Sequence, residues 1–143
     1  MDLTQRARRT FSNDRYATQA TGAVIEQVTI DRTCCSLTLT DVHRNAKGAV
    51  MGGVYFTLAD FAFAIAVHTT LLAESPEEEE PELCWVSVGS TIHFVCAPRG
   101  DLLRARTQCI RQGRRQALYQ ITVSDSDDRT VALVTTTGAR VEK

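Results

Sequence analysis

Hydrophobic and polar residues alternate in six separate stretches of this chain, which is the pattern of half-buried β-strands. The stretch 116–123 also gathers Leu118, Tyr119, Ile121 and Val123, whose side chains favour strands. Polar turns separate the last stretches by only a few residues, so we expect an antiparallel meander there. The predicted strands span about residues 23–31, 34–42, 85–95, 102–111, 116–123 and 131–141.

A different pattern occupies the middle of the sequence, where residues 54–68 are almost all apolar. Alanine and leucine in this run favour a helix, and neither glycine nor proline interrupts it. A helix that is apolar on every side is buried in a protein core or in a membrane. The run is shorter than the roughly 20 apolar residues that cross a bilayer. We therefore predict a core helix of about four turns, from Val54 to about His68, preceded by a loop of small residues.

Asp60 is the only acidic residue of this predicted helix. It lies about two turns in, beyond the reach of capping and of the helix dipole. An ionised carboxylate without partners in an apolar site costs several kcal/mol, so the side chain must be paired, hydrogen-bonded or kept for function. Two interpretations stay open at this point: a structural Asp that bonds a nearby polar group, or a carboxylate that carries acid–base or nucleophilic catalysis.

Two further segments complete the predicted architecture. Residues 1–21 form an N-terminal helical segment, weakly amphipathic over 3–20, and we assign its arginines to a solvated face. The proline-bounded acidic run at 73–83 predicts an exposed, mobile loop, with a solvated linker favoured over a binding role. The fold class is α+β: an antiparallel sheet of five to six strands wrapped around one long central helix, plus a short N-terminal helix.

Composition narrows the class of protein. A length of 143 residues suits a single domain, 1–143, with one core. The net charge of −1 gives no basic field that would favour nucleic acid or an anionic membrane. Five cysteines without a CxxC pair and three scattered histidines predict free thiols, no metal and no other cofactor. The N-terminus lacks the apolar region of a secretory signal, so we expect a cytoplasmic location.

The loop and helix around Asp60 resemble a known motif. The segment from Asn45 to Asp60, NAKGAVMGGVYFTLAD, is similar to the pattern N-x-x-G-x-x-H-G-G-x-x-x-x-L-x-D of PaaI-type acyl-CoA thioesterases, which have the hotdog fold. Further similarity lies in STIHF at 90–94 with the turn that follows, in RQGRR at 111–115 and in TVA at 130–132. The resemblance covers nearly the whole chain beyond about residue 22. It implies a hotdog enzyme that hydrolyses an acyl-CoA thioester to the free acid and CoA.

The resemblance implies four catalytic residues. The acid that matches Asp60 is a general base for water or a nucleophile, and the sequence does not decide between these roles. The amide that matches Gly52 polarises the thioester carbonyl, since an N–H at a helix N-terminus is unpaired and lies at the positive end of the dipole. Asn45 would hold the Asp60 region or the water; the alternative is a loop-turn Asn. Ser87 matches a strand hydroxyl that reaches the site from the partner subunit in some members; the alternative is an ordinary strand Ser.

The resemblance also implies a substrate-binding set. It consists of Met51, Gly53, Ser90, Phe94, Arg111, Gly113, Arg114 and Arg115. The three arginines flank Gly113 in a hairpin, where they would clamp the phosphates of CoA or else form an ordinary solvated turn. Met51 departs from the family pattern, which has His there, and methionine neither titrates nor donates a strong hydrogen bond. Because Asp60 and Gly52 are kept, we expect an active enzyme; the alternative is a non-catalytic acyl-CoA-binding protein.

Assembly and substrate are implied in outline. Family members pair their sheets edge to edge as homodimers, with sites at the subunit interface, and commonly form dimers of dimers, so the resemblance implies a homotetramer. A hydratase of the same fold would need a catalytic His near an Asp or Glu in its motif, and the sequence has no such pattern. The acyl group, whether aryl or medium- to long-chain, stays open.

Overall fold

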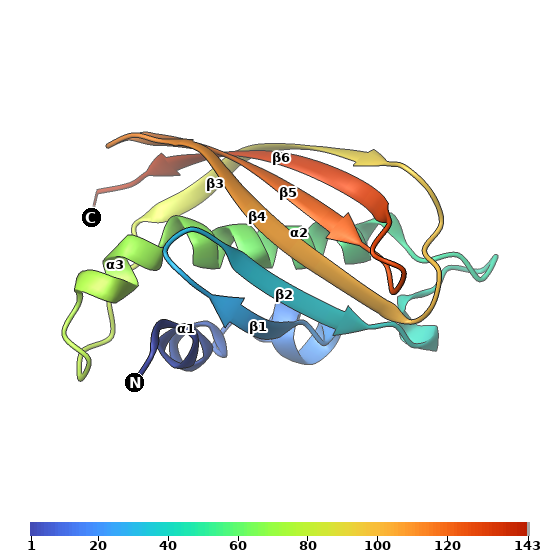
Figure 1. Ribbon diagram of the computed structural model, residues 1–143, viewed down its shortest axis with the longest axis horizontal. Coiled ribbons are helices and arrows are strands. Elements are labelled where there is room, and N and C mark those ends of the chain that lie inside the picture. Colours follow the sequence, from blue (N-terminus) through green and yellow to red (C-terminus); the bar gives the residue numbers. More distant parts are fainter. Residues whose placement is uncertain (143) are drawn as a thin grey trace.

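One six-stranded antiparallel sheet wraps around one long helix in the computed structural model, which describes residues 1–142 (Figure 1). The strand order is β1-β2-β4-β5-β6-β3. The strands are β1 (Val24–Val28), β2 (Thr33–Thr38), β3 (Trp85–Phe94), β4 (Leu102–Gln112), β5 (Gln116–Ser124) and β6 (Thr130–Arg140). The central helix, α2 (Gly52–Val67), packs against every strand of this sheet. The predicted α+β hotdog architecture is confirmed, with six strands.

Helix α2 forms the centre of the core because it is apolar around its whole circumference. Its Phe63 ring packs edge-on against Tyr119 of β5, with ring centroids 5.5 Å apart. Gly138 of β6 makes room for that ring, since a Cβ at this position would lie 2.8 Å from the Phe63 Cζ atom. The helix begins at Gly52, two residues earlier than predicted. The glycine pair lies in the first turn of the helix, away from the interior positions where glycine is most destabilising.

The N-terminal segment differs from the prediction in two ways. It consists of helix α1 (Leu3–Phe11) and a separate π-helical turn, η1 (Tyr16–Thr21), in place of one helix over 3–20. The assignment of its arginines to a solvated face is wrong for Arg6, whereas Arg8 and Arg15 are exposed as predicted. Arg6 is only 7% exposed and donates to the Pro76 carbonyl, 3.2 Å away.

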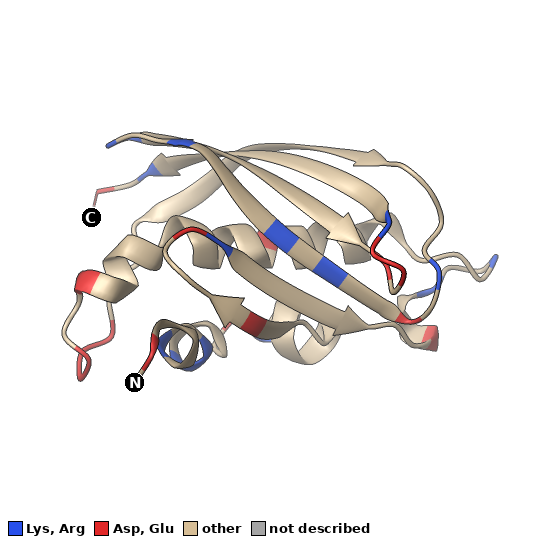
Figure 2. Cartoon of the chain, viewed as in Figure 1, with Lys and Arg blue, Asp and Glu red and all other residues tan. Residues whose placement is uncertain are grey.

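The acidic loop, coloured red in Figure 2, is exposed, as predicted. Its side chains nevertheless contact the N-terminal segment. A short helix, α3 (Thr69–Glu74), precedes it. Glu80 forms an ion pair with Arg9, whose Nε lies 2.9 Å from the carboxylate, and accepts a hydrogen bond from the Thr10 hydroxyl at 2.9 Å. The N-terminal amine pairs with Glu77 at 2.8 Å. These acids therefore hold the N-terminal helix against the body of the protein.

The two edge strands of the sheet, β1 and β3, differ in whether their backbone groups are covered. At β1, Arg8 donates to the carbonyls of Ile25 and Glu26, and the Thr4 hydroxyl bonds both backbone groups of Val28. Helix α1 thus covers the polar backbone of this edge. At the other edge, β3 pairs with β6 and with no other strand among residues 1–142, and it is exposed over most of its length. Apolar side chains on and beside β3 lie in solvent: Val86, Val88, Phe94 and Val95. An open edge of this kind is suited to pairing with another chain.

Candidate active site

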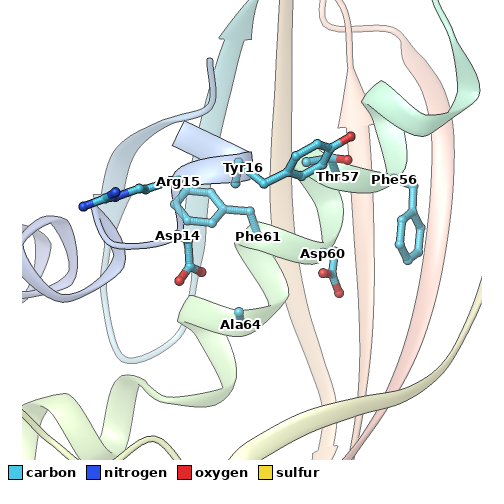
Figure 3. Close-up of a pocket in the computed structure, with 9 residues that line it drawn as sticks. Asp14, Arg15, Tyr16, Phe56, Thr57, Asp60, Phe61 and Ala64 are labelled. Carbon is cyan, nitrogen blue, oxygen red and sulfur yellow. The ribbon is translucent and has the colours of Figure 1, made fainter. Parts of the chain in front are cut away.

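Asp60 lies half-buried in the middle of α2 and faces a groove of about 500 Å³ (Figure 3). The groove runs between α2 and the start of the N-terminal π-helical turn. Its lining is Asp14, Arg15, Tyr16, Ala17, Phe56, Thr57, Asp60, Phe61 and Ala64. The rings of Phe56, Tyr16 and Phe61 make most of this surface apolar, so the groove is shaped for an apolar group beside a carboxylate.

The surroundings of Asp60 favour its protonated form. Burial raises the pKa of the Asp60 carboxyl above its ordinary value. A hydrogen bond from Ser87 acts in the opposite direction, and the charge of Asp14 adds to the rise. The carboxylate thus has few partners to stabilise its charge, and its pKa moves toward the range in which a carboxyl is a useful base.

Ser87 reaches Asp60 from within the same chain because of an irregularity in β3. Ser90 and Ser87 are three residues apart, so regular alternation would direct them to opposite faces of the sheet. The register of β3 against β6 shifts between Ser87 and Gly89, and this bulge sets Ser87 opposite Gly138 and Ser90 opposite Thr136. Both serines therefore face α2. Ser90 uses its hydroxyl to bond that of Thr136 at 2.9 Å.

The glycine pair at the start of α2 presents the second group of interest. Gly52 is the first residue of the helix, so its amide lies among the N–H groups that no helical carbonyl can accept. The ring of Phe94 covers Gly52 so closely that a Cβ there would lie 2.9 Å from its Cζ atom. Gly53 opens onto free space. Gly52 and Phe94 line a second hollow of about 440 Å³, separate from the Asp60 groove.

Gly52 and Asp60 do not meet within one chain. Eight residues separate them on α2, which corresponds to about 12 Å along the helix axis. A thioester carbonyl within hydrogen-bonding reach of the Gly52 amide is therefore too far from the Asp60 carboxylate of the same chain. The predicted catalytic set is divided between two places on one helix.

Asn45 and Met51 occupy the loop before α2. The Asn45 side-chain oxygen accepts from the amides of Lys47 at 2.9 Å and Ala49 at 3.1 Å, so it folds its own turn. Met51 caps the helix without a side-chain hydrogen bond and is 51% exposed. Neither side chain contributes a group to the Asp60 groove of its own chain.

The predicted arginine hairpin lies at the opposite end of α2 from Gly52. Gln112 ties the hairpin to that end, donating to the Val67 carbonyl at 3.1 Å. Gly113 closes the turn with an N–H bond to the Gln116 carbonyl at 2.8 Å. Arg114 and Arg115 line a polar hollow of about 760 Å³ together with Arg140, which the sequence did not single out. Arg111 is exposed on β4 and does not line this hollow.

The buried histidines have structural partners. His43 Nε2 lies 2.7 Å from the Thr21 carbonyl, and His68 Nε2 accepts the Trp85 N–H at 3.0 Å. Among residues 1–142, no group of three or more His, Cys, Asp or Glu side chains is arranged to hold a metal ion. No helix in that range is long and apolar enough to cross a membrane.

Sequence reasoning missed the partners of Asp60 in the groove. Phe56 and Ala64 were readable in principle, because they lie four residues before and after Asp60 and so share its helix face. Asp14 had no such signal, since it lies 46 positions from Asp60 in a segment without a motif.

Comparisons with known proteins place these features in context. Residues 47–132 match the family model described as the thioesterase superfamily. The chain is 31% identical over 130 residues to the acyl-coenzyme A thioesterase PaaI of Escherichia coli K12, covering 90% of this chain and 84% of that protein. The structure of the E. coli PaaI protein from the phenylacetic acid degradation operon aligns with a TM-score of 0.81 at 26% identity, over 99% of this chain and 97% of that one. A hypothetical thioesterase protein from Streptococcus pneumoniae TIGR4, solved with coenzyme A, shares the fold with a TM-score of 0.75 at 19% identity, over 92% and 99% of the two chains.

Proposed function

The chain belongs to the thioesterase superfamily as a PaaI-type hotdog thioester hydrolase, and from that premise we propose that it hydrolyses acyl-CoA thioesters with the Asp60 carboxylate. One observation carries the assignment to Asp60. The carboxyl is half-buried on an apolar helix, has a raised pKa and faces an apolar groove large enough for an acyl group. A structural Asp at such a site would be expected to have more hydrogen-bond donors.

The proposed chemistry uses Asp60 and Gly52, the two groups that lie apart on α2. The Asp60 carboxylate removes a proton from a water molecule while that water attacks the thioester carbon, or the carboxylate attacks that carbon itself. The carbonyl oxygen gains negative charge in the transition state, and the Gly52 amide at the positive end of the helix dipole stabilises it. In the first route, collapse of the tetrahedral intermediate breaks the C–S bond, the leaving thiolate takes the proton that Asp60 removed from water, and CoA and the free acid are released. In the second route, collapse releases the CoA thiolate and leaves a mixed anhydride on Asp60, which water then hydrolyses to the free acid.

This chemistry requires two copies of the chain. Gly52 and Asp60 of one helix are about 12 Å apart, so one thioester meets both groups only if they come from different subunits. The open β3 edge, with its exposed apolar side chains, supplies a surface for pairing. We therefore propose a homodimer in which each active site combines Gly52 of one subunit with Asp60 of the other. Two such dimers associate as a homotetramer.

Recognition of CoA is assigned to positive charge at the β4–β5 hairpin. Arg114 and Arg115 line a polar hollow there, and guanidinium groups bind phosphate through paired donors. The S. pneumoniae relative of the same fold was solved with coenzyme A, which supports a CoA ligand. Asn45 and Ser87 complete the proposed catalytic set, the former by shaping the loop before Gly52 and the latter by its bond to Asp60.

The decisive experiment is hydrolysis of a panel of acyl-CoAs, from phenylacetyl- and hydroxybenzoyl-CoA to long-chain thioesters, by wild type and Asp60→Asn. We expect turnover of at least one thioester, reduced on the order of 10²-fold or more in the variant. Wild-type activity in Asp60→Asn would remove Asp60 from the mechanism.

Met51 motivates the competing function, a non-catalytic acyl-CoA-binding protein. Its exposed side chain stands where the family pattern has a titratable His. Binding of CoA thioesters without hydrolysis would favour that function. Gain of turnover in Met51→His would then show which group is missing.

A further inference from the structure

Two carboxylates share the Asp60 groove. Asp14 comes from the link between α1 and the π-helical turn, whereas Asp60 comes from α2. Figure 3 shows their carboxylates on the two sides of Ala64, with the apolar rings around them. Asp14 does not belong to the proposed catalytic set.

No cation among residues 1–142 neutralises Asp14. Within that range its carboxylate has no hydrogen bond or ion pair, and only its backbone groups are used: its N–H donates to the Phe11 carbonyl at 3.0 Å, and its carbonyl accepts from the Thr18 N–H at 3.0 Å and the Thr18 hydroxyl at 3.0 Å. Arg15 also lines the groove, but Figure 3 shows its guanidinium directed away from both acids. Tyr16 turns its hydroxyl away from them as well.

Asp60 therefore faces few groups that act on its charge. From the N-terminal segment it faces Asp14, with Arg15 and Tyr16 at the rim; from β3 it faces the Ser87 hydroxyl. Burial raises the pKa of Asp14, as it does that of Asp60. Two like charges in a mostly apolar groove destabilise the fold, so the arrangement has no evident structural benefit. Other acids near the N-terminus do have structural partners: Asp2 caps α1, and Glu77 and Glu80 pair with the N-terminal amine and Arg9.

We propose that Asp14 is a positioning residue that acts on the reaction through Asp60. It lies in the same groove, and its own charge sets the pH range in which the Asp60 carboxylate works. The inference rests on the proposed function of Asp60. When Asp14 is ionised it disfavours ionisation of Asp60, so Asp60 gains its proton at a higher pH and is a stronger base once deprotonated. Removing the Asp14 charge should move the acid limb of the pH–rate profile to lower pH. The two carboxyls titrate as a pair.

The test compares Asp14→Asn with Asp14→Glu, which keeps the charge, and with Asp31→Asn, which removes an exposed acid from the β1–β2 turn. The first measurement is kcat/KM at pH 5 and pH 8 for an acyl-CoA that the wild type hydrolyses. We expect Asp14→Asn to raise the ratio of the pH 5 to the pH 8 value about threefold, with Asp14→Glu and Asp31→Asn close to wild type. In about 1 M salt the difference should shrink, since exposed charges are then screened over about 3 Å.

A second readout does not depend on turnover. The ¹³C carboxyl resonance of Asp60, assigned by its loss in Asp60→Asn, should titrate at a lower pH in Asp14→Asn than in wild type. An unchanged Asp60 titration and an unchanged pH ratio in Asp14→Asn would overturn the inference, as would an equal change in Asp31→Asn. Full activity in Asp60→Asn is a different result, because it overturns the proposed function of Asp60 and leaves the NMR titration to judge the coupling.

Discussion

Asp60 on α2 and Asp125 in the β5–β6 turn are both aspartates shielded from solvent, yet their pKa values move in opposite directions. Burial raises the pKa of Asp60, with one hydrogen bond from Ser87 to offset it. Burial acts on Asp125 as well, but hydrogen bonds from Arg99, Arg129 and Asp127 outweigh it and lower the pKa of that carboxyl to about 2.

The difference lies in the number of donors around each carboxylate. Asp125 accepts the amides of Arg99 at 2.8 Å, Asp127 at 3.0 Å and Arg129 at 3.0 Å. It also accepts a hydrogen bond from Arg129 Nε at 3.0 Å, and a second guanidinium nitrogen lies 2.9 Å away in an ion pair. Its oxygens are fully used within the fold, so Asp125 fixes a turn. Asp60 keeps oxygens free beside a groove, which is the condition for acting on a ligand.

The largest expected effect concerns the Gly52 amide at the start of α2. Its loss should lower the reaction rate without lowering the stability of the fold. Gly52→Pro removes the N–H, and proline suits the first position of a helix. Met51 already has φ −67° and ψ 139°, a conformation compatible with a following proline. We expect kcat to fall about 10²-fold or more, the usual loss for one oxyanion donor, with little loss of Tm.

Gly52→Ala is the matched control for that variant. It adds the same Cβ against the Phe94 ring but keeps the N–H. An equal loss of kcat in both variants would assign the effect to the displaced ring and not to the amide.

For Asp125 we expect the reverse, a loss of stability without a loss of activity. Asp125→Asn removes the ion pair with Arg129. It also replaces one carboxylate oxygen with an NH2 group that cannot accept from the N–H donors of the turn, so the turn loses several bonds at once. We expect a Tm several degrees below wild type in a thermal melt, with kcat/KM per folded molecule within about twofold of wild type. Asp127→Asn, in the same turn, alters an exposed side chain and should leave Tm nearly unchanged. A large loss of activity at unchanged Tm would contradict the structural role.

Acid titration of stability sharpens the same contrast. The folded pKa of Asp125 is lower than its unfolded value, so its contribution is present above about pH 4 and is lost as the pH falls toward 2. Urea unfolding of wild type between pH 5 and pH 2 should show this loss, and Asp125→Asn should show less of it. Identical pH dependence in the two proteins would assign acid unfolding to other carboxylates.

The smallest expected effect concerns Ser87, the one hydrogen-bond donor to Asp60 among residues 1–142. Because the Ser87 hydroxyl lowers the pKa of Asp60, Ser87→Ala should raise that pKa and move the acid limb of kcat/KM to higher pH. We expect the ratio of the pH 5 to the pH 8 value to fall about threefold, opposite in sign to Asp14→Asn. Ser90→Ala, on the same strand face but bonded to Thr136, is the control. A ratio that stays at the wild-type value would show that Ser87 does not act on the Asp60 charge.

Much of this molecule was predictable from local patterns. The six strands follow from period-two alternation and turn residues, and α2 follows from one continuous apolar run, because each pattern reports the burial of a single element. Asp60 stood out for the same reason, as an acid in an apolar run. Its role remains a prediction, as do those of Gly52 and Asn45.

Contacts between elements were decided only by the tertiary structure. Ser87 faces Asp60 because a bulge in β3 reverses the alternation, and a bulge depends on how two strands pair. Asp14 enters the groove, and the arginines of α1 bind the acidic loop and the β1 edge, through packing of segments far apart in sequence. A sequence records the preference of each residue for burial or solvent. Which polar groups then face one another is settled by register and packing, and those contacts shift the pKa of Asp60.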